Sequence, residues 1–453
     1  MVRPPVIRRP PEWGVEPVPS EARQMRAVDF FVLWFSLGVG LLVLAAGTLL
    51  VPLGLTLVEI LIVSVAGSLL GSALLVAAAL PGTSRGVPTM VSLRPLLGLR
   101  GSYVPTALNV LQLLGWATFE LLIMGLAGAA LIGPVFGPPW TPIVLIPIFG
   151  AIVGLLAVGG PITVVRNWLE RFAIWLVIGS TVWIAVQLAL RPIDWGARYA
   201  TVTVPSSYLL ALDLVVVMPI SWWPLVSDYN RFARRRRGAT AGTLIGYTAA
   251  NTAFYVLGAV LAVVVVTGGA PDFVAAIGLL NLGFLALLFI LVDETDNAFA
   301  NVYSTAVSVQ NAAPRLRQLT LVIATTLIAV VLAVGLQFLY PTPAVAVGSG
   351  FEGFLFLIGG LFVPLLGILA ADHFAVRRGS YRPEEFSDRT RSVRPAAFLA
   401  WVPSALLYFA IVLGGLPWLQ NVGATLPSFA AAAAIYLAVT WVESRVRAPV
   451  VTN

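Results

Sequence analysis

Long apolar runs separated by short polar segments dominate the pattern of this chain. Twelve of these runs are long enough to form a membrane-crossing helix, which needs about 20 mostly apolar residues. The pattern therefore predicts an all-α polytopic membrane protein with 12 transmembrane helices. Their predicted centres lie near Gly38, Val65, Gly115, Gly150, Val177, Val217, Leu257, Leu291, Val330, Leu361, Leu406 and Tyr436.

The polar segments between the runs divide the chain into tails, spans and loops. The longest of them are too short to build a hydrophobic core, so no soluble domain is predicted, and the first 27 residues lack the apolar stretch of a cleavable signal peptide. We predict these parts: a cytoplasmic N-terminal tail (1–27), spans one to five (28–190), spans six to ten (207–371), a cytoplasmic loop (372–395), accessory spans eleven and twelve (396–442) and a cytoplasmic C-terminal tail (443–453).

Two predicted spans contain helix-breaking residues. Gly38 and Gly40 interrupt span one, and Pro219 lies in span six, followed by Ser221 and Pro224. Proline removes a backbone donor and glycine loosens the turn, so unwound backbone can offer carbonyls to a cation or a substrate. Because each break opens a group of five spans, we predict a 5+5 inverted repeat with its binding site between the breaks. Close helix packing is the alternative use of the two glycines.

Composition agrees with a membrane protein and orients it. The chain is 59% hydrophobic and 10% charged, with a mean hydropathy of +0.95, whereas soluble domains are about 45–50% apolar. All 27 basic residues are arginine. If the N-terminus is inside, all but Arg191 and Arg198 fall on the cytoplasmic side, as the positive-inside rule requires. We therefore predict a multi-pass protein of the cell (inner or plasma) membrane with both termini cytoplasmic.

The excess of arginine does not indicate a nucleic-acid-binding protein. Although the net charge is +7, the run 234–237 is interpreted as a topology anchor that contacts anionic lipid. The lack of cysteine excludes disulfides and thiol nucleophiles. The single histidine, His373, lies in the arginine-rich loop after span ten, where we expect it to be solvated, so a Ser-His-Asp triad inside the membrane is excluded. No protein partner and no enzymatic activity are predicted.

The most informative polar feature is an acidic cluster within a predicted span. Asp293, Glu294 and Asp296 directly follow the apolar run 285–292. One charged side chain at the bilayer centre costs about 2.5–3.5 kcal/mol on insertion scales. Three together must therefore face a wet cavity, an ion or a polar ligand, which indicates a site for moving something across a membrane.

Helical spacing places further polar groups beside these acids. Asp293, Asn297 and Asn301 share one face of span eight, with Asp296 close by. Carboxylates and a hydroxyl such as that of Thr295, joined by carbonyls of a broken helix, suit a small cation. Alternatively, one crowded acid takes up and releases a proton, or the groups form a purely structural network. The asparagine amides can both donate to and accept from the edge of a heterocycle.

Span three carries a second polar position. Trp116 and Glu120 are four residues apart, so they lie on one helical face. An indole can stack on a flat ring while a carboxyl group bonds the edge of that ring. The alternative is a packed tryptophan beside a glutamate that bonds another helix.

These residues resemble the nucleobase:cation symporter family, which includes cytosine, purine, allantoin and hydantoin permeases and hydroxymethylpyrimidine transporter-like proteins. The serine to Asp-Tyr-x-Arg-Phe stretch after span six is its most specific part, and the matches cover roughly residues 29–312. Five stretches carry the resemblance: Phe30 to Gly47, Gly86 to Gly101, Leu114 to Trp116, Ser221 to Phe232 and Ala300 to Ser304.

The resemblance implies a leucine-transporter-type fold of ten core helices plus two, and assigns roles to residues. Trp116 would stack on the substrate and Glu120 would bond it, although many relatives have glutamine there. Trp222 would replace an aromatic ring that relatives carry near Met218 and Pro219. The full predicted substrate site comprises Gly38, Gly40, Trp116, Glu120, Met218, Pro219, Ser221, Trp222, Asn297 and Asn301.

The resemblance also implies an ion site and an inner gate. Val292, Thr295 and Asp296 align with the sodium ligands of the family, and with Asp293 and Glu294 they form the predicted coupling site for Na⁺ or H⁺. Asp228 and Arg231 are expected at the inner mouth as gate or anchor.

We therefore predict a secondary active transporter that imports a nucleobase or related small heterocycle, coupled to Na⁺ or H⁺ by alternating access, without a cofactor. One alternative is an amino acid or amine symporter on the same fold, in which Glu120 and Asp293 would pair with a cationic amine. A remote alternative is an intramembrane metalloenzyme with Asp293 and Asp296 as metal ligands.

Overall fold

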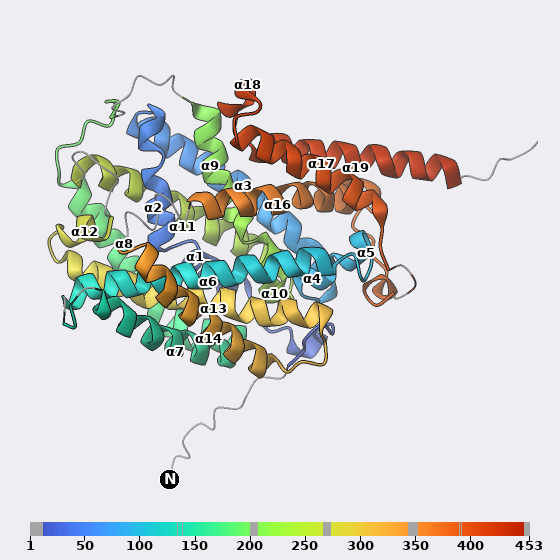
Figure 1. Cartoon of the computed structure of the whole chain (residues 1–453), viewed down its shortest axis with the longest axis horizontal. Coiled ribbons are helices and arrows are strands. Elements are labelled where there is room, and N and C mark those ends of the chain that lie inside the picture. Colours follow the sequence, from blue (N-terminus) through green and yellow to red (C-terminus); the bar gives the residue numbers. More distant parts are fainter. Residues whose placement is uncertain are drawn as a thin grey trace, which may run out of the picture.

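The described part of the chain is helical, and the only β contacts there are two isolated bridges. The structure is a computed structural model without ligands (Figure 1). It describes residues 12–133, 135–137, 139–199, 207–265, 273–342, 352–388, 390 and 392–447. The outermost parts of both predicted tails, 1–11 and 448–453, lie outside this range.

The first group of helices corresponds to predicted spans one to five. Its members are α1 (Ala27–Ser36), α2 (Leu41–Thr48), α3 (Leu57–Arg85), α6 (Tyr103–Ile132), α7 (Trp140–Thr163) and α8 (Ile174–Ala189), with the short helices α4 (Thr89–Ser92) and α5 (Arg94–Leu97) between α3 and α6.

The second group corresponds to predicted spans six to ten, and the accessory helices follow it. These helices are α9 (Tyr208–Ser221), α10 (Val226–Asn230), α11 (Arg236–Val265), α12 (Phe273–Gly278), α13 (Gly283–Ala312), α14 (Gln318–Leu339), α16 (Glu352–Ala371), α17 (Pro395–Val412), α18 (Pro417–Gln420) and α19 (Thr425–Arg447).

Eleven of the twelve predicted centres lie in helices, and Gly38 lies in the break between α1 and α2. By length and apolarity, however, only nine described helices qualify as membrane spans, or ten when the bent pair of α1 and α2 is included. α7 and α8 run on as one helix of 50 residues, Trp140–Ala189, and α13, which carries the acidic cluster, is too polar to qualify. The all-helical fold is thus confirmed, whereas the count of twelve spans is not.

Span one is interrupted where the glycines predicted it. α1 ends at Ser36, α2 begins at Leu41, and the two parts are bent by 59° relative to each other. A Cβ at Gly40 would come within 3.1 Å of Glu294 Oε1 and 3.2 Å of Asn297 Nδ2. Glycine therefore allows the backbone of the break to approach the polar side chains of α13.

Span six is interrupted later than predicted. Pro219 lies inside α9, and the break follows at a 3₁₀ turn, Trp223–Leu225, before α10. Pro224 has no N–H with which to continue the ladder, so the helix ends shortly before it. Ser221 stays within the helix, where its hydroxyl donates to the Met218 carbonyl at 2.7 Å. The break at Pro219 is therefore corrected to the Trp222–Leu225 turn.

The predicted boundary after span ten also moves. A π-helical turn, Asp372–Val376, continues α16 beyond residue 371. His373 in this turn is buried, with its ring stacked on Tyr381 at 5.6 Å between centroids and 13° between planes. The expectation of a solvated loop histidine is wrong, because the helix extends the polar segment back into the protein.

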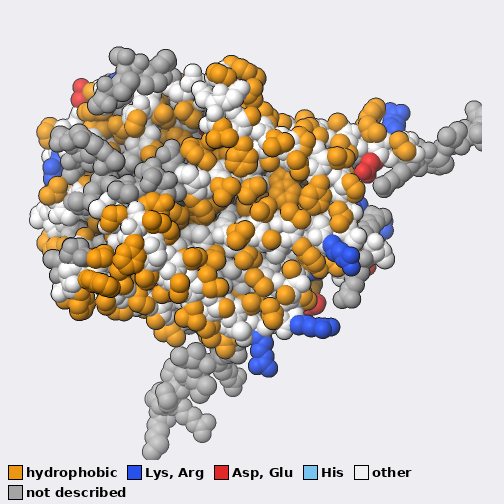
Figure 2. Space-filling model, in the orientation of Figure 1, with side chains coloured by type: hydrophobic (Ala, Val, Ile, Leu, Met, Phe, Trp, Pro, Cys, Tyr) orange, Lys and Arg blue, Asp and Glu red, His pale blue; other side chains and the backbone are white. Residues whose placement is uncertain are grey.

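The packing of the long helices places the two breaks near the middle of the bundle. α1 packs on α11, α6 packs on α13, and α3 packs on both α9 and α11. α16 and α17 pack on α19, which forms the accessory layer along one side (Figure 1). The visible outer surface is largely apolar, and most of its arginines gather towards one end (Figure 2). We call this end, where Figure 1 shows α5, the arginine-rich end, and Arg85, Arg94, Arg377 and Arg394 line one cavity there.

Candidate functional site

The acidic cluster of α13 contacts the break in span one. Ser36, the last residue of α1, donates its hydroxyl hydrogen to Asp293 Oδ1 at 2.5 Å. The first amide of α2, Leu41 N–H, donates to the Glu294 carboxylate. A carboxylate at the N-terminus of a helix satisfies an amide without an intrahelical partner and interacts favourably with the helix dipole.

Asn297 completes the contact with the break. Its Nδ2 donates to the Val39 carbonyl at 2.9 Å, while its Oδ1 accepts no hydrogen bond from the described residues. One turn further along α13, Asn301 Nδ2 donates to the Asn297 carbonyl at 3.0 Å. Of the two asparagines, Asn297 is therefore the one that contacts the break directly.

Glu120 joins the acids of α13 from another helix. It projects from α6, which packs on α13, and is only 4% exposed. Its carboxyl group interacts with that of Glu294 and, electrostatically, with Asp293 and Asp296. The structure thus brings the predicted acids of spans three and eight into one cluster of four carboxyl groups, which we call the acidic cluster.

Several oxygens of the acidic cluster have no hydrogen-bond partner among the described residues. These are Glu120 Oε2, Asp293 Oδ2, Glu294 Oε2 and both oxygens of Asp296. None of the four residues is more than 4% exposed. Buried carboxylates are costly unless they are protonated, paired or bound to a cation. The cluster is therefore not a saturated structural network, and protons, a cation or a polar ligand would stabilise it.

The three predicted sodium ligands of α13 have different neighbours. The Thr295 hydroxyl donates to the Val292 carbonyl at 2.6 Å. Both residues line an apolar cavity of about 220 Å³ with Gly128 of α6 and Phe149 of α7. At about 100° per residue, position 295 lies about 160° around α13 from Asp293 and position 292 about 100° from it, while Asp296 lies about 60° from Asp293 and about 40° from position 292. Only Asp296 of the three belongs to the acidic cluster.

Trp116 lies one turn before Glu120 on α6. Its ring packs edge-to-face on Phe354 of α16, with centroids 5.3 Å apart and planes at 74°. Phe119 packs on the same Phe354 ring at 5.4 Å. The structure therefore places Trp116 beside the acidic cluster, with Phe354 as an aromatic neighbour that the sequence did not indicate.

The predicted residues of span six separate into different roles. Met218 and Pro219 are buried in α9, where it packs on α3. Trp222 lies at the break, with its ring at 6.3 Å and 89° to that of Trp34 on α1. Trp222 thus lies beside α1, and its role as a stacking ring stays a prediction.

Sequence reasoning missed two polar side chains near the cluster, Ser36 and Tyr247. Tyr247 on α11 is fully buried, and its hydroxyl makes no hydrogen bond to the described residues. It lies close enough to Glu120 for an electrostatic interaction, and its ring is 6.2 Å from that of Trp34. A signal was available for Ser36, which closely precedes the break, whereas Tyr247 is one of several polar positions in α11, among them Thr243 and Asn251.

Asp228 and Arg231 lie towards the arginine-rich end, after the break in span six. The Asp228 carboxylate accepts a hydrogen bond from the Thr89 N–H at 2.9 Å. Arg231 donates to the Gly14 carbonyl at 2.8 Å and to the Tyr303 hydroxyl at 3.1 Å. Both Asp228 and Arg231 are about 1% exposed, so they hold elements together in this conformation.

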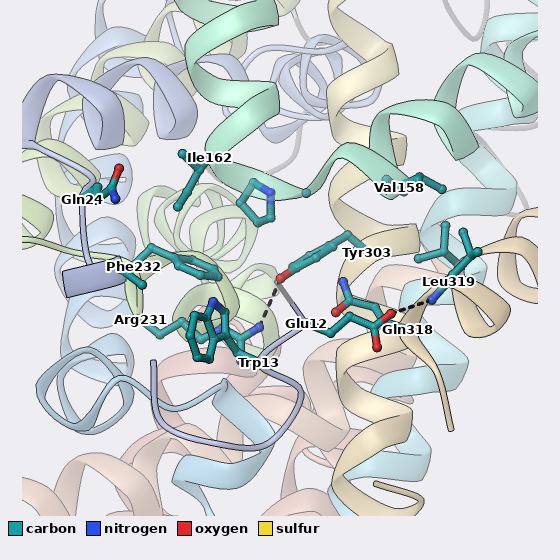
Figure 3. A pocket seen from close by; sticks show the side chains of 15 residues that line it. Glu12, Trp13, Gln24, Val158, Ile162, Arg231, Phe232, Tyr303, Gln318 and Leu319 are labelled. Atoms are coloured by element: carbon teal, nitrogen blue, oxygen red, sulfur yellow. Dashed lines mark hydrogen bonds between the residues drawn. The ribbon is translucent and has the colours of Figure 1, made fainter. Parts of the chain in front are cut away.

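A cavity of about 180 Å³ lies beside Arg231 (Figure 3). Glu12 and Trp13 of the N-terminal segment border it, facing Tyr303 and Gln318 on the other side. The Leu319 N–H donates to Glu12 at 3.3 Å. The N-terminal segment thus crosses this end of the bundle and covers the approach to Arg231.

The positions of the acidic side chains do not support the alternative of an intramembrane metalloenzyme. Among the residues that the structure describes, no group of three or more His, Cys, Asp or Glu side chains is arranged to hold a metal ion. Asp293 and Asp296 face Glu120 and Glu294, but the four carboxyl groups do not converge as a metal centre would require.

Comparison with known sequences identifies similar transporters. Residues 17–435 match the sequence profile of a family described as permeases for cytosine/purines, uracil, thiamine and allantoin. The allantoin permease of Bacillus subtilis (strain 168) is 24% identical over 416 residues, which cover 83% of this chain and 80% of that protein. The cytosine permease of Escherichia coli (strain K12) is 25% identical over 350 residues, covering 75% and 77%.

A solved structure shares the fold. Mhp1, a nucleobase-cation-symport-1 family transporter solved in a closed conformation with bromovinylhydantoin bound, superimposes with a TM-score of 0.79. The alignment covers 96% of each chain at 19% sequence identity. This likeness confirms the predicted leucine-transporter-type fold, whereas at such an identity it carries no information on the ligand.

Proposed function

The chain belongs to the family of permeases for cytosine/purines, uracil, thiamine and allantoin, and from this membership we propose that it imports a nucleobase or a related small heterocycle by alternating access. It is a multi-pass membrane transporter and not an enzyme. For this chain we also propose a substrate site, a coupling site and an orientation in the membrane.

The acidic cluster is the observation that carries the proposal. Four carboxyl groups lie at the broken helix of span one in an apolar bundle, and several of their oxygens lack a partner among the described residues. Discontinuous helices at the middle of a transporter commonly form the site for substrate and coupling ion. Intramembrane acids are expensive and therefore indicate such a pathway.

The substrate is proposed to be a flat ring with hydrogen-bond donors. Trp116 lies one turn from Glu120 on α6, and Trp222 at the break in span six supplies a second aromatic ring, beside Trp34 of α1. Carboxylate oxygens only accept hydrogen bonds, so they favour an edge with N–H groups, such as that of cytosine, a purine or a hydroxymethylpyrimidine. An uncharged ring also suits a cluster in which some of the carboxyl groups are protonated and therefore carry no charge.

Proton coupling is favoured over sodium coupling by charge. One Na⁺ would neutralise one of the four carboxyl groups, leaving three buried negative charges. Protons bound to the remaining carboxyl groups neutralise them and so remove the free-energy cost of burying their negative charges. We therefore propose that Asp293 and Asp296, beside the Ser36 hydroxyl, carry the coupling proton, with a sodium ion at the same oxygens as the competing arrangement.

The arginine-rich end is proposed to face the cytoplasm, in the inner or plasma membrane of the cell. Arg85, Arg94, Arg377 and Arg394 all lie there, which satisfies the positive-inside rule. In this orientation Arg231 and the N-terminal segment cover the inner mouth, and the remaining arginines contact lipid headgroups.

A transport assay tests the proposal directly. The purified protein would be reconstituted in proteoliposomes, and uptake of a labelled heterocycle panel would be measured under an inward proton gradient, an inward sodium gradient or neither. We expect uptake of at least one uncharged heterocycle that depends on the proton gradient. If no heterocycle is taken up or competes, the substrate assignment is wrong, and dependence on sodium alone would reassign the coupling ion.

A second candidate function follows from the same carboxyl groups. A cationic amine could pair with Glu120 or Asp293, as in an amino acid or amine symporter. The assay distinguishes the two, because amines would then compete with the label more strongly than uncharged rings do.

A further inference from the structure

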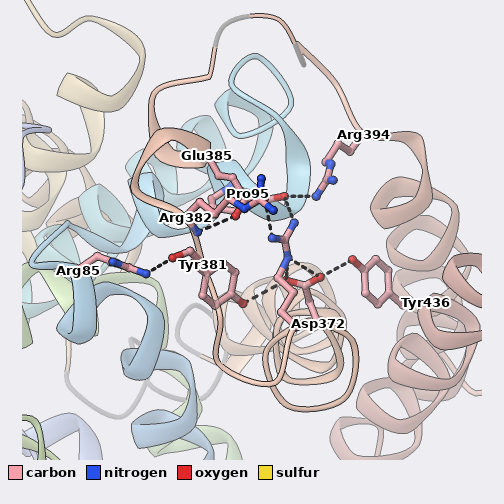
Figure 4. A network of polar contacts seen from close by, with 9 residues as sticks. Arg85, Pro95, Asp372, Tyr381, Arg382, Glu385, Arg394 and Tyr436 are labelled. Carbon is pink, nitrogen blue, oxygen red and sulfur yellow. Dashed lines mark hydrogen bonds and ion pairs between the residues drawn. The ribbon is translucent and has the colours of Figure 1, made fainter. Parts of the chain in front are cut away.

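A second polar cavity lies at the arginine-rich end, away from the acidic cluster. Its volume is about 1170 Å³, and five arginines from four chain segments line it. Arg85 ends α3, Arg94 begins α5, Arg377 and Arg382 follow α16, and Arg394 precedes α17. The cavity therefore joins the first group of spans to the segment that leads into the accessory helices (Figure 4).

Backbone carbonyls hold three of the five guanidinium groups of this cavity in place, whereas Arg377 is paired with the carboxylates of Asp372 and Glu385. Arg85 and Arg394 donate to the Tyr381 and Pro95 carbonyls, respectively. Arg94 donates to the Phe386 carbonyl at 2.8 Å. Carbonyl oxygens fix the direction of a guanidinium group without cancelling its charge. The charges are therefore preorganised for an anion, since little further side-chain entropy is lost on binding.

The acids of the cavity are fewer than its arginines. Only Glu384, Glu385 and Asp388 line it, which leaves an excess of two positive charges among its charged lining residues. Burial raises the pKa of Glu385, but the Arg382 N–H and the Arg377 guanidinium outweigh burial and hold that pKa below its ordinary value. Glu385 is therefore ionised at neutral pH. Its carboxylate already forms an ion pair with the Arg377 guanidinium group, whose Nη1 is 2.7 Å from Glu385 Oε1.

The surroundings indicate how an anion would reach the cavity. Phe374, Val376 and Val393, on the segments that flank it, are 54%, 45% and 50% exposed. Arg377 and Arg394 also line an adjoining cavity of about 580 Å³, which continues towards α19. Apolar groups beside a fixed set of guanidinium groups at the end of a membrane bundle match a phospholipid, whose headgroup is anionic and whose chains are apolar.

We propose that the arginine-lined cavity is a binding site for a phosphate group, carried by the headgroup of an anionic phospholipid of the leaflet at the arginine-rich end. A phosphate there accepts hydrogen bonds from Arg85, Arg382 and Arg394 in the bidentate manner that guanidinium groups favour. It ties α3 to the segment between α16 and α17. The bound lipid stabilises the contact between the transport core and the accessory helices.

The proposal is tested by lipid-dependent stability of the whole protein. Unfolding would be followed in detergent with inorganic phosphate, with phosphatidylcholine, or with a mixture of phosphatidylcholine and phosphatidylglycerol. Lipid retained after purification would be identified by native mass spectrometry. We expect phosphatidylglycerol to raise the midpoint and to be retained. If phosphate alone raises the midpoint equally, the site stands and its ligand is a free phosphate.

Matched variants separate this site from general charge effects. Arg85→Gln with Arg382→Gln should weaken phosphatidylglycerol retention about tenfold or more, since each removes charge-assisted hydrogen bonds. Arg191→Gln, the control for the single variant Arg382→Gln, removes an exposed arginine that the positive-inside pattern places on the opposite side of the membrane and should leave retention unchanged. The single variant Arg382→Gln, whose side chain is exposed, covers the case in which the double variant does not fold. No stabilisation by either ligand, or equal loss in the control, would overturn the proposal.

Discussion

The four carboxyl groups of the acidic cluster have different neighbours, and these differences assign them different roles. Asp293 accepts from Ser36, and Glu294 accepts from the first amide of α2. Neither oxygen of Asp296 accepts a hydrogen bond from the described residues. Asp293 and Glu294 therefore help to hold the break in place, while Asp296 has both oxygens available for a proton or a cation.

Replacing Asp296 should alter coupling more than substrate binding. Asp296→Asn removes one titratable group and keeps the shape of the side chain. We expect substrate affinity to change by less than about threefold, or about 0.6 kcal/mol, while gradient-driven accumulation falls about tenfold or more. The measurements are equilibrium binding and uptake in proteoliposomes as a function of pH.

The control for Asp296 is the neighbouring Thr295. Its hydroxyl donates to the Val292 carbonyl, and its position lies about 100° around α13 from Asp296 and about 160° from Asp293. Thr295→Val should therefore leave coupling nearly unchanged, whereas the sodium site implied by the family resemblance requires it to abolish coupling. Loss of coupling in Thr295→Val with normal coupling in Asp296→Asn would reverse the assignment.

Trp116 should contribute to substrate affinity through its ring. Trp116→Ala is expected to weaken binding by about 1–3 kcal/mol, the range that base stacking on aromatic side chains contributes, or about 5- to 150-fold. Trp116→Phe should retain much of the affinity. Cation and pH dependence should be unaltered in both, as measured by binding at several pH values.

Phe119 provides the comparison for Trp116, because it packs on the same Phe354 ring. Phe119→Ala should reduce stability by loss of packing but change affinity less than Trp116→Ala does. Equal losses of affinity in the two variants would indicate that Trp116 acts through Phe354 and not on the substrate.

The sequence predicted the residues of the site better than their directions. The cost of burying Asp293, Glu294 and Asp296 was sufficient to locate the cluster in the chain. The direction of Val292 and Thr295 depends on the rotation of α13, which its packing on α6 and α7 determines. Residue spacing gives the relative angle between two side chains, but it does not indicate which neighbouring helix they face.

At the scale of elements, the two broken spans differ in what supports them. The break in span one is supported by α13 through Ser36, Leu41 and their carboxylate partners. The outer part of span six is instead fixed to the accessory layer. Asp213 of α9 accepts hydrogen bonds from the amides of Ala424, Thr425 and Leu426 at 3.0–3.3 Å.

Asp213 therefore caps α19 from another helix. Its carboxylate takes the place of a local capping side chain at the N-terminus of α19, where the helix dipole also favours a negative charge. The residue is 6% exposed, so these bonds are shielded from water. Through this contact, α9 and α19 should move together during alternating access.

Asp213→Asn should loosen this connection. An amide accepts through one oxygen only and presents its own N–H groups to the helix amides, so we expect a loss of about 1–3 kcal/mol in unfolding free energy. The measurement is denaturation in detergent, with uptake as a second readout. Asp194→Asn, which changes an exposed carboxylate in the loop after α8, should have little effect. Equal stability of both variants would show that the cap is dispensable.

The difference between predicted and observed breaks has a local cause. Both Pro219 and Pro224 lack an N–H, so sequence alone offered two places for the interruption in span six. α9 continues through Pro219 in its packed position against α3 and ends before the 3₁₀ turn that contains Pro224. Tertiary packing selected between two equivalent breakers, and the sequence contained no information on that choice.

At the scale of the whole molecule, the N-terminal segment closes one end of the bundle. The Met25 N–H donates to the Phe232 carbonyl at 3.0 Å, and the Arg234 N–H donates to the Met25 carbonyl at 2.9 Å. Arg231 donates to Gly14 further along the same segment. The acidic cluster is therefore separated from the arginine-rich end by a layer that the chain before α1 helps to form.

Movement of this layer can be measured because the chain contains no cysteine. Ala157 lines the cavity beneath the segment and is about 1% exposed, so Ala157→Cys introduces a small buried reporter in a thiol-free background. We expect slow reaction with a membrane-impermeant maleimide applied from the arginine-rich side. Substrate together with the driving gradient should change that rate, because transport must open this end.

Arg231→Gln in the Ala157→Cys background tests what holds the layer closed. Glutamine cannot bond the Gly14 carbonyl and the Tyr303 hydroxyl together as the guanidinium group does, and loss of hydrogen bonds to a charged donor costs about 1.5–3 kcal/mol each. If Arg231 holds the N-terminal segment closed, maleimide labelling of the introduced cysteine should accelerate about tenfold or more without substrate. An unchanged labelling rate in a variant whose thermal unfolding is normal would mean that the backbone contacts at Met25 hold the segment and that Arg231 is not needed to keep it closed.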